Sequence, residues 1–251
     1  MKPVVVVDEN IPGVHELLGD IATIRTVAGR EIDAGTLAGA EALLVRSVTR
    51  VGEDLLDGSP VRFVGTCTAG VDHIDQPYLA SAGIGFAHAP GANARSVVEY
   101  VVSALCRLGV DHGRVKPGMS VGIFGLGNVG GRLYRVLEAC GFHCTGYDPF
   151  LPDHHGMKLA TDPQRVLEAD IVTLHTPLTR DTAHPTYHMF GKSELACLKR
   201  SAVLINSSRG AVVDNDALLQ LLHQRQDLAV VLDVWENEPT IDRGLMERVT
   251  F

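Results

Sequence analysis

The chain has 251 residues, of which 45% are hydrophobic, so it can build one large or two ordinary domains with substantial cores. Its formal net charge of -8 and its scattered Lys and Arg residues argue against a nucleic-acid partner. No apolar run approaches the roughly 20 residues of a membrane helix, and the opening MKPVVVVDEN turns acidic too early for a signal peptide. We therefore expect a cytoplasmic protein with no membrane partner.

Residues 1–95 alternate short apolar strands with helical stretches, the pattern of an α/β domain. The first strand, 4–7, is followed by polar residues that can cap a helix beginning near Gly13. A short helix is expected over 31–40. Further strands are expected at 21–28, within 41–48, at 61–65 and at 83–90.

Two of these strands lead into polar loops. Arg46 and Ser47 stand at the end of one strand, and Thr68, Ala69 and Gly70 lie in the loop after the next. Open parallel sheets bind ligands in the crevice outside the carboxyl ends of their strands. These five residues are therefore predicted to converge on one cleft.

A long helix is expected over 93–108, where apolar residues follow a helical period without internal Gly or Pro. Its length suits a helix that links two domains, and a polar, glycine-containing stretch, 112–120, follows it. We place the domain boundary close to Arg95, with a first domain at 1–95 and a second at 96–251.

The second domain opens with a strand, 121–124, followed by three glycines spaced G-x-G-x-x-G and then by an amphipathic helix. Gly125 permits the tight turn, Gly127 lets a pyrophosphate approach the backbone, and Gly130 lets the helix lie close to the strand. Asn128 and Val129 would supply N–H groups at the helix N-terminus, where an anion is stabilised. The pattern predicts dinucleotide binding; a glycine-rich turn that packs a helix without a ligand is the alternative.

A second short strand ends at Asp148, where a dinucleotide site needs an acid for the adenosine ribose hydroxyls. A carboxylate there would repel a 2′-phosphate, so we expect NAD rather than NADP. In the following loop, His154 and His155 are adjacent, which is poor spacing for chelation. No metal site is predicted.

The rest of the chain continues the strand and helix alternation. Helices are expected at 162–170, 188–201 and 212–226, the last capped by Asp214. One strand ends at His175 and Thr176, and Thr176 would face the cofactor. Another runs into the loop of Ser207, Ser208 and Arg209, and the last ends at Asp233, with Glu236 and Glu238 beyond it.

The five cysteines are odd in number and show no C-x-x-C spacing. Cys140 and Cys144 suggest a redox pair only weakly, because Cys144 falls in a predicted core strand. Buried, reduced thiols are the favoured interpretation.

Three late residues suit hydride transfer on a hydroxy acid, which needs a cation for the carboxylate, a base, and an acid that orients the base. Arg209 suits the first task, because a guanidinium binds a carboxylate at two points. Glu238 suits the third, and Asp233 could bind the nicotinamide amide. The alternative for each is a surface charge on a loop.

Four segments, GLGNVG (125–130), HTPL (175–178), INSSRGAVVD (205–214) and LDVWENEP (232–239), make the sequence resemble the NAD-dependent D-isomer-specific 2-hydroxyacid dehydrogenases. The resemblance implies two doubly wound parallel-sheet domains, a flavodoxin-like substrate domain and a Rossmann NAD-binding domain. Other segments, VDEN (7–10), LLVRSVT (43–49) and PGANARSVVEYV (90–101) among them, resemble the members that oxidise 4-phospho-D-erythronate in the vitamin B6 (pyridoxal phosphate) pathway.

The resemblance also implies residue roles. Arg209 would bind and polarise the substrate, and Glu238 would pair with the catalytic histidine. Contacts with NAD would come from Asp148, Thr176, Asp233 and the segment 207–209, and contacts with the phosphorylated substrate from Ser47 and Thr68. To these we add Arg46, because a phosphate needs a cation nearby; pairing of Arg46 with Glu41 is the alternative.

One departure from the family pattern concerns the proton-transferring histidine, which lies in a T-P-H-I-x-G-like segment after the last strand. None of the eleven histidines matches that segment, and neither His175 nor His73 suits the role. A truncated or partly ordered chain is therefore expected, lacking the returning helix of the first domain and a C-terminal dimerisation domain. Such a chain would bind NAD but turn over feebly, since losing a general acid or base costs ~10²–10⁴ in rate. The full-length protein would be a homodimer.

Two other functions stay open. Another family member could act on an unphosphorylated hydroxy acid such as glycerate or lactate. The same scaffold also serves an NAD-regulated corepressor that binds peptides, although nothing in 1–95 demands the apolar groove that such a protein needs.

Overall fold

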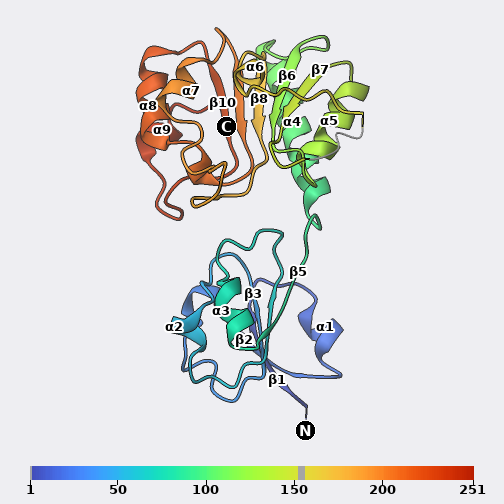
Figure 1. The fold of residues 1–251 in the computed structure, drawn as a ribbon, viewed down its shortest axis with the longest axis vertical. Helices are drawn as coiled ribbons and strands as arrows, with labels where there is room; N and C mark the ends of the chain where they lie inside the picture. The colour runs from blue at the N-terminus through green and yellow to red at the C-terminus, as the bar shows by residue number, and fades with distance from the viewer. Residues whose placement is uncertain (1, 152–155) are drawn as a thin grey trace. The chain divides into compact units, whose positions relative to one another are not determined.

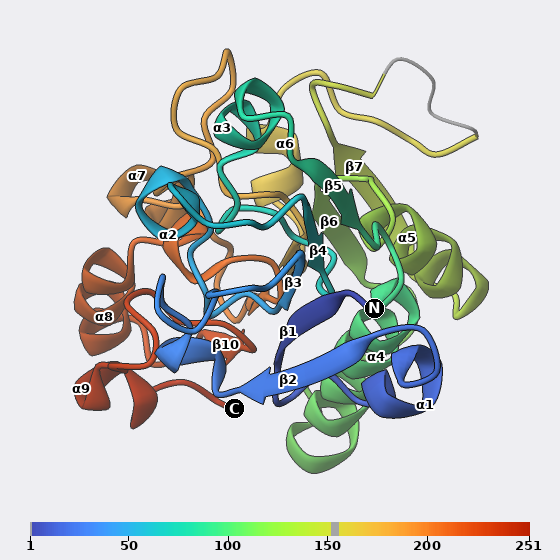
Figure 2. The same ribbon diagram turned by 90° about the horizontal axis from the view of Figure 1, so that it is seen from below.

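The computed structural model describes residues 2–151 and 156–251. The chain divides into two compact units, Met1–Asn93 and Ala94–Phe251. Each unit contains one five-stranded parallel sheet (Figures 1 and 2). The predicted α/β class with two parallel sheets is confirmed.

The first unit has the strand order β2-β1-β3-β4-β5, which Figure 2 shows from below. This is the flavodoxin-like order, in which the sheet winds in both directions from its first strand. The elements are β1 Val4–Asp8, α1 Val14–Leu18, β2 Thr23–Val27, η1 Gly29–Glu31, β3 Ala42–Val45, α2 Glu53–Leu56, β4 Phe63–Thr66, α3 Gln76–Ser81 and β5 Gly85–His88.

Two local predictions for the first unit are wrong. The span 31–40 holds no α-helix. Asp33 and Thr36 bond each other's backbone N–H groups at 2.8 and 3.0 Å, as at a helix start, but Gly39 has a left-handed backbone with φ 72°, and only turns form. Helix α1 has no polar cap either. Its N-cap is Gly13, with φ 73°, and Asp8 instead accepts the backbone N–H of Asn10.

The second unit has the order β10-β9-β8-β6-β7, again two-way winding from its first strand, β6 (Figure 1). Its elements are α4 Ala94–His112, β6 Ser120–Phe124, α5 Gly130–Ala139, β7 His143–Tyr147, α6 Gln164–Leu167, β8 Ile171–Leu174, α7 Lys192–Ala196, β9 Val203–Asn206, η2 Gly210–Val212, α8 Asn215–Gln224, β10 Ala229–Leu232 and α9 Arg243–Met246.

Two helices of this unit differ from their predicted lengths. Helix α4 continues through Gly109 to His112, four residues past the predicted end at Leu108. Helix α7 is much shorter than the predicted 188–201, because His188 and Ser201 both have left-handed backbones, with φ 50° and 59°. The predicted cap of α8 is confirmed, since the Asp214 carboxylate accepts the N–H of Ala217.

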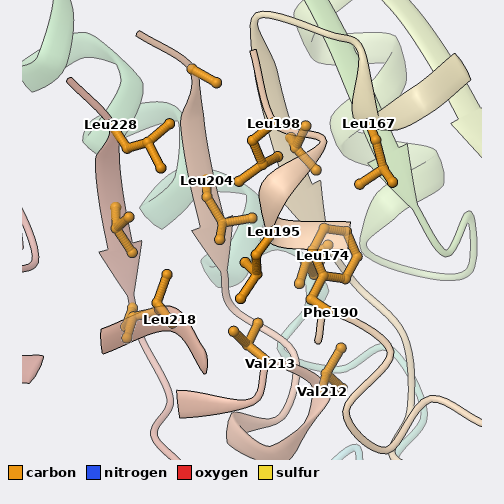
Figure 3. Close-up of a cluster of buried hydrophobic side chains, with 14 of the residues drawn as sticks. Leu167, Leu174, Phe190, Leu195, Leu198, Leu204, Val212, Val213, Leu218 and Leu228 are labelled. Carbon is orange, nitrogen blue, oxygen red and sulfur yellow. The ribbon is translucent and has the colours of Figure 1, made fainter. Parts of the chain in front are cut away.

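Two buried clusters cover the two faces of the second sheet. On one face, Val121 and Ile123 of β6 pack with apolar residues of α4 and α5. On the other, Phe124 packs with residues of α6, α7, α8 and α9, part of which Figure 3 shows. Because the strands are covered on both faces, the ligand-binding surface lies at their ends.

The structure tests the expectation that the cysteines are buried, reduced thiols. Cys144 is buried, and burial together with nearby Glu138 raises the pKa of its thiol to about 12. The other four cysteines are exposed and all five are free, so the expectation of buried thiols holds only for Cys144. Within the described residues, no helix combines the length and apolarity needed to span a bilayer.

Candidate functional site

The turn from β6 to α5, residues 125–130, holds three glycines in three different environments. Gly125 has φ 82°, and a Cβ there would lie 2.6 Å from the His175 carbonyl oxygen. A Cβ on Gly130 would overlap the carbonyl oxygen of Gly125. A Cβ on Gly127 would meet nothing within 4 Å. Chain packing therefore requires Gly125 and Gly130, whereas Gly127 leaves open space beside an exposed backbone.

The amino end of α5 follows directly after this turn. Its N-cap, Val129, receives no side-chain cap, and the helix has ten residues. Uncapped N–H groups and the helix dipole stabilise an anion at this position. Asn128, the neighbouring residue, is exposed. The turn can hold a pyrophosphate on backbone alone.

Asp148 lies at the end of β7, beside this turn. One carboxylate oxygen accepts the N–H of Leu126 at 2.9 Å, and the other accepts the N–H of Phe150 at 3.0 Å. The carboxylate is therefore fixed relative to the glycine turn. It also lines the pocket described next.

A pocket of about 330 Å³ lies where β6, β7 and β8 end. Strands β6 and β8 are the two neighbours between which the strand order changes direction. The crevice at the carboxyl ends of two such strands is the usual place for a ligand in sheets of this kind. The Thr176 hydroxyl in its wall is buried and has no hydrogen-bond partner among the described residues. Lining residues from the three strand ends are Phe124, Gly125, Tyr147, Asp148, Thr176 and Pro177.

His175 links β8 to the loop after β9. One ring nitrogen lies 2.9 Å from the Thr173 hydroxyl, and the other lies 3.4 Å from the Ser207 hydroxyl. Burial lowers the pKa of the imidazole to about 3, so the ring is neutral near pH 7. That His175 is not the proton-transferring residue stays a prediction.

The loop 207–210 carries Arg209 and packs directly on the segment after β10. A Cβ on Gly210 would overlap the backbone of Trp235 and Glu236. The Asp233 N–H donates to the Asn206 carbonyl at 3.0 Å. The structure therefore joins the loop of Arg209 to the segment 233–238, which holds the two acids singled out from the sequence.

The two glutamates of that segment differ in their environments. Glu236 is engaged, because one oxygen lies 2.7 Å from the His188 ring and the other accepts the N–H of Asn215. Glu238 is exposed, and one of its oxygens accepts the Trp235 N–H at 2.8 Å. Its other oxygen has no hydrogen-bond partner in the described part of the chain. Burial raises the pKa of Asp233, and the charge of Glu238 raises it further.

The sequence reasoning did not single out Asn206, the last residue of β9, or the pairing of His188 with Glu236. Asn206 is 1% exposed, and its side chain contacts both Ser208 and Arg209. The available signal was an amide at the end of an otherwise apolar strand. His188 gave no signal, because its position depends on a left-handed backbone and on contacts far along the chain.

In the first unit, the two predicted loops are neighbours at the carboxyl ends of β3 and β4, where Val45 pairs with Thr66. The Thr68 hydroxyl lies 2.8 Å from that of Thr66 and donates to the Gly70 carbonyl at 3.0 Å. Arg46 is exposed and lies close enough to Cys67 to lower the pKa of its thiol, which burial and Asp8 raise.

The environments of the remaining predicted residues in this unit are simple. Ser47 is exposed, and Ala69 and Gly70 are half-buried. Among the described residues, Arg46 makes no ion pair, so it is not engaged by Glu41. Its guanidinium is available at the loop surface.

His154 and His155 lie outside the described residues. Within residues 2–151 and 156–251, no group of three or more His, Cys, Asp or Glu side chains is arranged to hold a metal ion.

The doubly wound sheet, the glycine turn, the acid beside it and the pocket at the reversal point together define a dinucleotide-binding α/β protein. Residues 109–250 match the model of the D-isomer specific 2-hydroxyacid dehydrogenase NAD binding domain. The chain therefore belongs to the D-isomer specific 2-hydroxyacid dehydrogenase family, and its second unit is an NAD-binding domain. Both the family and the cofactor are as the sequence predicted.

Curated relatives and solved structures agree with this assignment. The chain is 50% identical over 247 residues to erythronate-4-phosphate dehydrogenase of Cellvibrio japonicus (strain Ueda107), covering 98% of this chain and 64% of the relative. It is 51% identical over 247 residues to the enzyme of the same name from Sodalis glossinidius (strain morsitans), covering 98% and 65%. The chain thus spans just under two thirds of the length of these relatives.

Two solved structures share the fold. D-lactate dehydrogenase from Aquifex aeolicus, complexed with NAD and lactic acid, has a TM-score of 0.80 at 23% identity, covering 97% of this chain and 83% of that one. An NADPH-dependent glyoxylate/hydroxypyruvate reductase from Sinorhizobium meliloti, in complex with NADP and malonate, has a TM-score of 0.82 at 23% identity, covering 98% and 83%. The fold therefore serves both cofactors, and the choice between them depends on local residues.

Proposed function

We propose that this protein oxidises the C2 hydroxyl of 4-phospho-D-erythronate with NAD, producing 2-oxo-3-hydroxy-4-phosphobutanoate and NADH, on the route to pyridoxal 5′-phosphate. One structural observation carries the oxidoreductase part: the loop of Arg209 packs on the segment 233–238 at the same sheet edge as the glycine turn. The substrate rests on the curated relatives, at about 50% identity, that are named erythronate-4-phosphate dehydrogenase.

The residues at the pocket fit NAD. Gly127, with open space at its Cβ position, would let the pyrophosphate reach the backbone N–H groups of Asn128 and Val129. The unpartnered hydroxyl of Thr176 would gain a hydrogen bond, and Asp148 would accept from the ribose hydroxyls. When bound, NAD supplies the acceptor for the hydride that leaves the substrate carbon.

Arg209 and the acids have separate roles in this proposal. The Arg209 guanidinium binds the substrate carboxylate at two points. Glu238 has one carboxylate oxygen without a partner among the described residues, and this supports a role in orienting the histidine that takes the hydroxyl proton. Asp233 binds the carboxamide of the nicotinamide, and Ser207 and Ser208 contact the cofactor beside it.

The phosphate of the substrate would bind in the first unit. Ser47 and Thr68 offer hydroxyls from neighbouring loops, and Ala69 and Gly70 continue the second loop with backbone groups. Arg46 supplies the cation. Its exposure, and the absence of an ion pair to it among the described residues, support this assignment.

We assign residues 1–95 to a substrate-binding domain and 96–251 to the NAD-binding domain, close to the observed division after Asn93. The protein would work in the cytoplasm as a homodimer, by similarity to its family. Five free cysteines suit a reducing compartment.

The 251-residue chain alone is expected to bind NADH and to turn over feebly. None of its described histidines is hydrogen-bonded to Glu238, and the His188 ring is already paired with Glu236. A missing general acid or base lowers the rate by ~10²–10⁴. Near-native turnover by this chain would contradict the expectation.

The test uses the protein as its gene encodes it, with NAD and one of three acids: 4-phospho-D-erythronate, D-glycerate or D-lactate. We expect NADH to form with a kcat/KM at least ~10-fold higher for the phosphorylated acid, because charged hydrogen bonds to the phosphate add about 1.5–3 kcal/mol of binding. Arg46→Ala should remove most of this preference and leave D-glycerate unaffected. Equal losses for both acids would support a family member that acts on unphosphorylated substrates.

A further inference from the structure

Asn206 occupies a position where the sheet otherwise places apolar side chains. Across the register, the residues level with it are Leu232 of β10, Leu174 of β8 and Phe124 of β6. All three of these belong to the buried cluster on one face of the sheet. Asn206 is 1% exposed. An amide buried here needs a compensating role, because an unbonded amide would cost about 1–3 kcal/mol.

The Asn206 side chain is bonded to the loop that carries Arg209. Its carbonyl oxygen accepts the Ser208 N–H at 3.1 Å and the Ser208 hydroxyl at 2.8 Å. Its NH₂ group donates to the Arg209 carbonyl at 2.9 Å. Only one orientation of the amide satisfies all three bonds, since an NH₂ group cannot accept and a carbonyl cannot donate.

The backbone of Asn206 holds the second loop of the site. Its carbonyl oxygen accepts the Asp233 N–H at 3.0 Å. One buried residue is therefore bonded to Ser208, to Arg209 and to the first residue of the segment 233–238. A fixed backbone on both sides restricts where the long Arg209 side chain can begin.

We propose that Asn206 is a positioning residue: its buried amide holds the loop 207–209 so that the Arg209 guanidinium meets the substrate carboxylate. This role rests on the proposed function of Arg209. The amide itself touches neither substrate nor cofactor. Its effect is exerted through the backbone of Ser208 and Arg209.

The main variant is Asn206→Asp, which keeps the shape and the acceptor for Ser208 but replaces the donor to the Arg209 carbonyl with an oxygen. The matched control is Asp170→Asn. Asp170 is also a polar residue at a strand end and accepts from Ser120, but it lies at the amino edge of the sheet.

The first measurement is steady-state turnover of 4-phospho-D-erythronate by the protein as its gene encodes it, with NADH affinity from fluorescence titration. Asn206→Asp should lower kcat/KM about 2- to 12-fold, the range that corresponds to one hydrogen bond worth about 0.5–1.5 kcal/mol, and should lower NADH affinity by a smaller factor. Asp170→Asn should leave both unchanged. An unchanged kcat/KM in Asn206→Asp overturns the proposal.

A double-mutant cycle with Arg209→Lys shows whether Asn206 acts through Arg209. In the Arg209→Lys protein, Asn206→Asp should add a loss of less than about 3-fold, because the two-point contact that the amide aligns is already gone. Fully additive losses would overturn the proposed route, since a general loss of stability would multiply through either background.

Hydrogen exchange separates this proposal from the function on which it rests. Asn206→Asp should speed exchange of amides in 207–210 and leave 121–124 protected. If the wild-type protein does not oxidise the substrate but Asn206→Asp still speeds exchange in 207–210, the proposed function is wrong and the support of the loop by Asn206 remains valid. Unchanged exchange in 207–210 overturns the holding itself.

Discussion

Two loops at the carboxyl edge of the second sheet are shaped by different residues. The glycine turn, residues 125–130, depends on the absence of side chains, because backbone atoms approach Gly125 and Gly130 closely. The Arg209 loop, residues 206–210, also needs glycine at Gly210, but it depends in addition on a side chain, the buried amide of Asn206. A backbone template suits a ligand common to a whole family, whereas a side-chain support suits the display of one particular cation.

The difference predicts where substitutions have their effect. Changes within the glycine turn should alter either the fold or cofactor binding, depending on what the missing Cβ would meet. Changes around the Arg209 loop should lower substrate turnover more than they lower cofactor affinity. The four predictions below test this contrast.

Gly130→Ala should have the largest effect. The new Cβ would overlap the Gly125 carbonyl oxygen, a backbone atom fixed by the turn, and would also approach Ile123 at 3.3 Å. Relieving the overlap requires α5 to move away from β6, and overpacking of this kind costs about 1–3 kcal/mol or more. Urea unfolding measures the loss. A native-like midpoint would show that the turn is looser than described.

Gly127→Ala should separate ligand binding from folding. Its Cβ meets nothing within 4 Å and its φ is not positive, so the free energy of unfolding should stay within about 1 kcal/mol of wild type. NADH affinity should fall at least ~10-fold, because the methyl group occupies the approach of the pyrophosphate. Fluorescence titration and urea unfolding of the same variant provide both numbers. An unchanged affinity would place the pyrophosphate elsewhere.

The contrast between the loops also shows what the sequence could predict. The glycine turn, Asp148 and the α8 cap were predictable because each depends on residues close together in the chain or on strand ends at one sheet edge. The missing helix at 31–40 depends on the left-handed backbone of Gly39, and the short α7 is bounded by two left-handed residues, His188 and Ser201. The roles of Asn206 and Glu236 depend on contacts between distant segments, which periodicity does not encode.

Asp148→Asn tests how the carboxylate beside the glycine turn contributes to nucleotide binding and to the choice between NADH and NADPH. The carboxylate accepts N–H groups from Leu126 and Phe150, and an amide retains only one accepting oxygen. We expect NADH affinity to fall about 3- to 10-fold and NADPH affinity to rise, since repulsion of the 2′-phosphate is removed. Paired titrations with the two nucleotides measure the ratio. Comparable affinities in the wild-type protein would contradict the role given to Asp148.

The last prediction concerns His175, which touches both loops: its carbonyl lies against Gly125, and its ring lies near the Ser207 hydroxyl. Its pKa in the folded protein is about 3, below the ordinary value of 6.5, so the unfolded chain binds more protons between these values. Stability contributed by the neutral ring is therefore complete above pH 6.5 and is lost as the pH falls toward 3.

Between these pH values the free energy of unfolding should fall by about 1 kcal/mol for each pH unit, near the limit of about 1.4 kcal/mol per pH unit for one proton. The carboxylates with lowered pKa values, Asp170 and Asp227, add their losses mainly below about pH 4, and Asp233, whose pKa is raised, is present in every variant, so a difference between variants from pH 6.5 to 4.5 reports the histidine. Urea unfolding across that window should show a shallower slope in His175→Asn than in His143→Asn, which removes an exposed histidine. Equal slopes would mean that the ring between the two loops is solvated, and the loops would then be coupled only through Asn206 and the sheet.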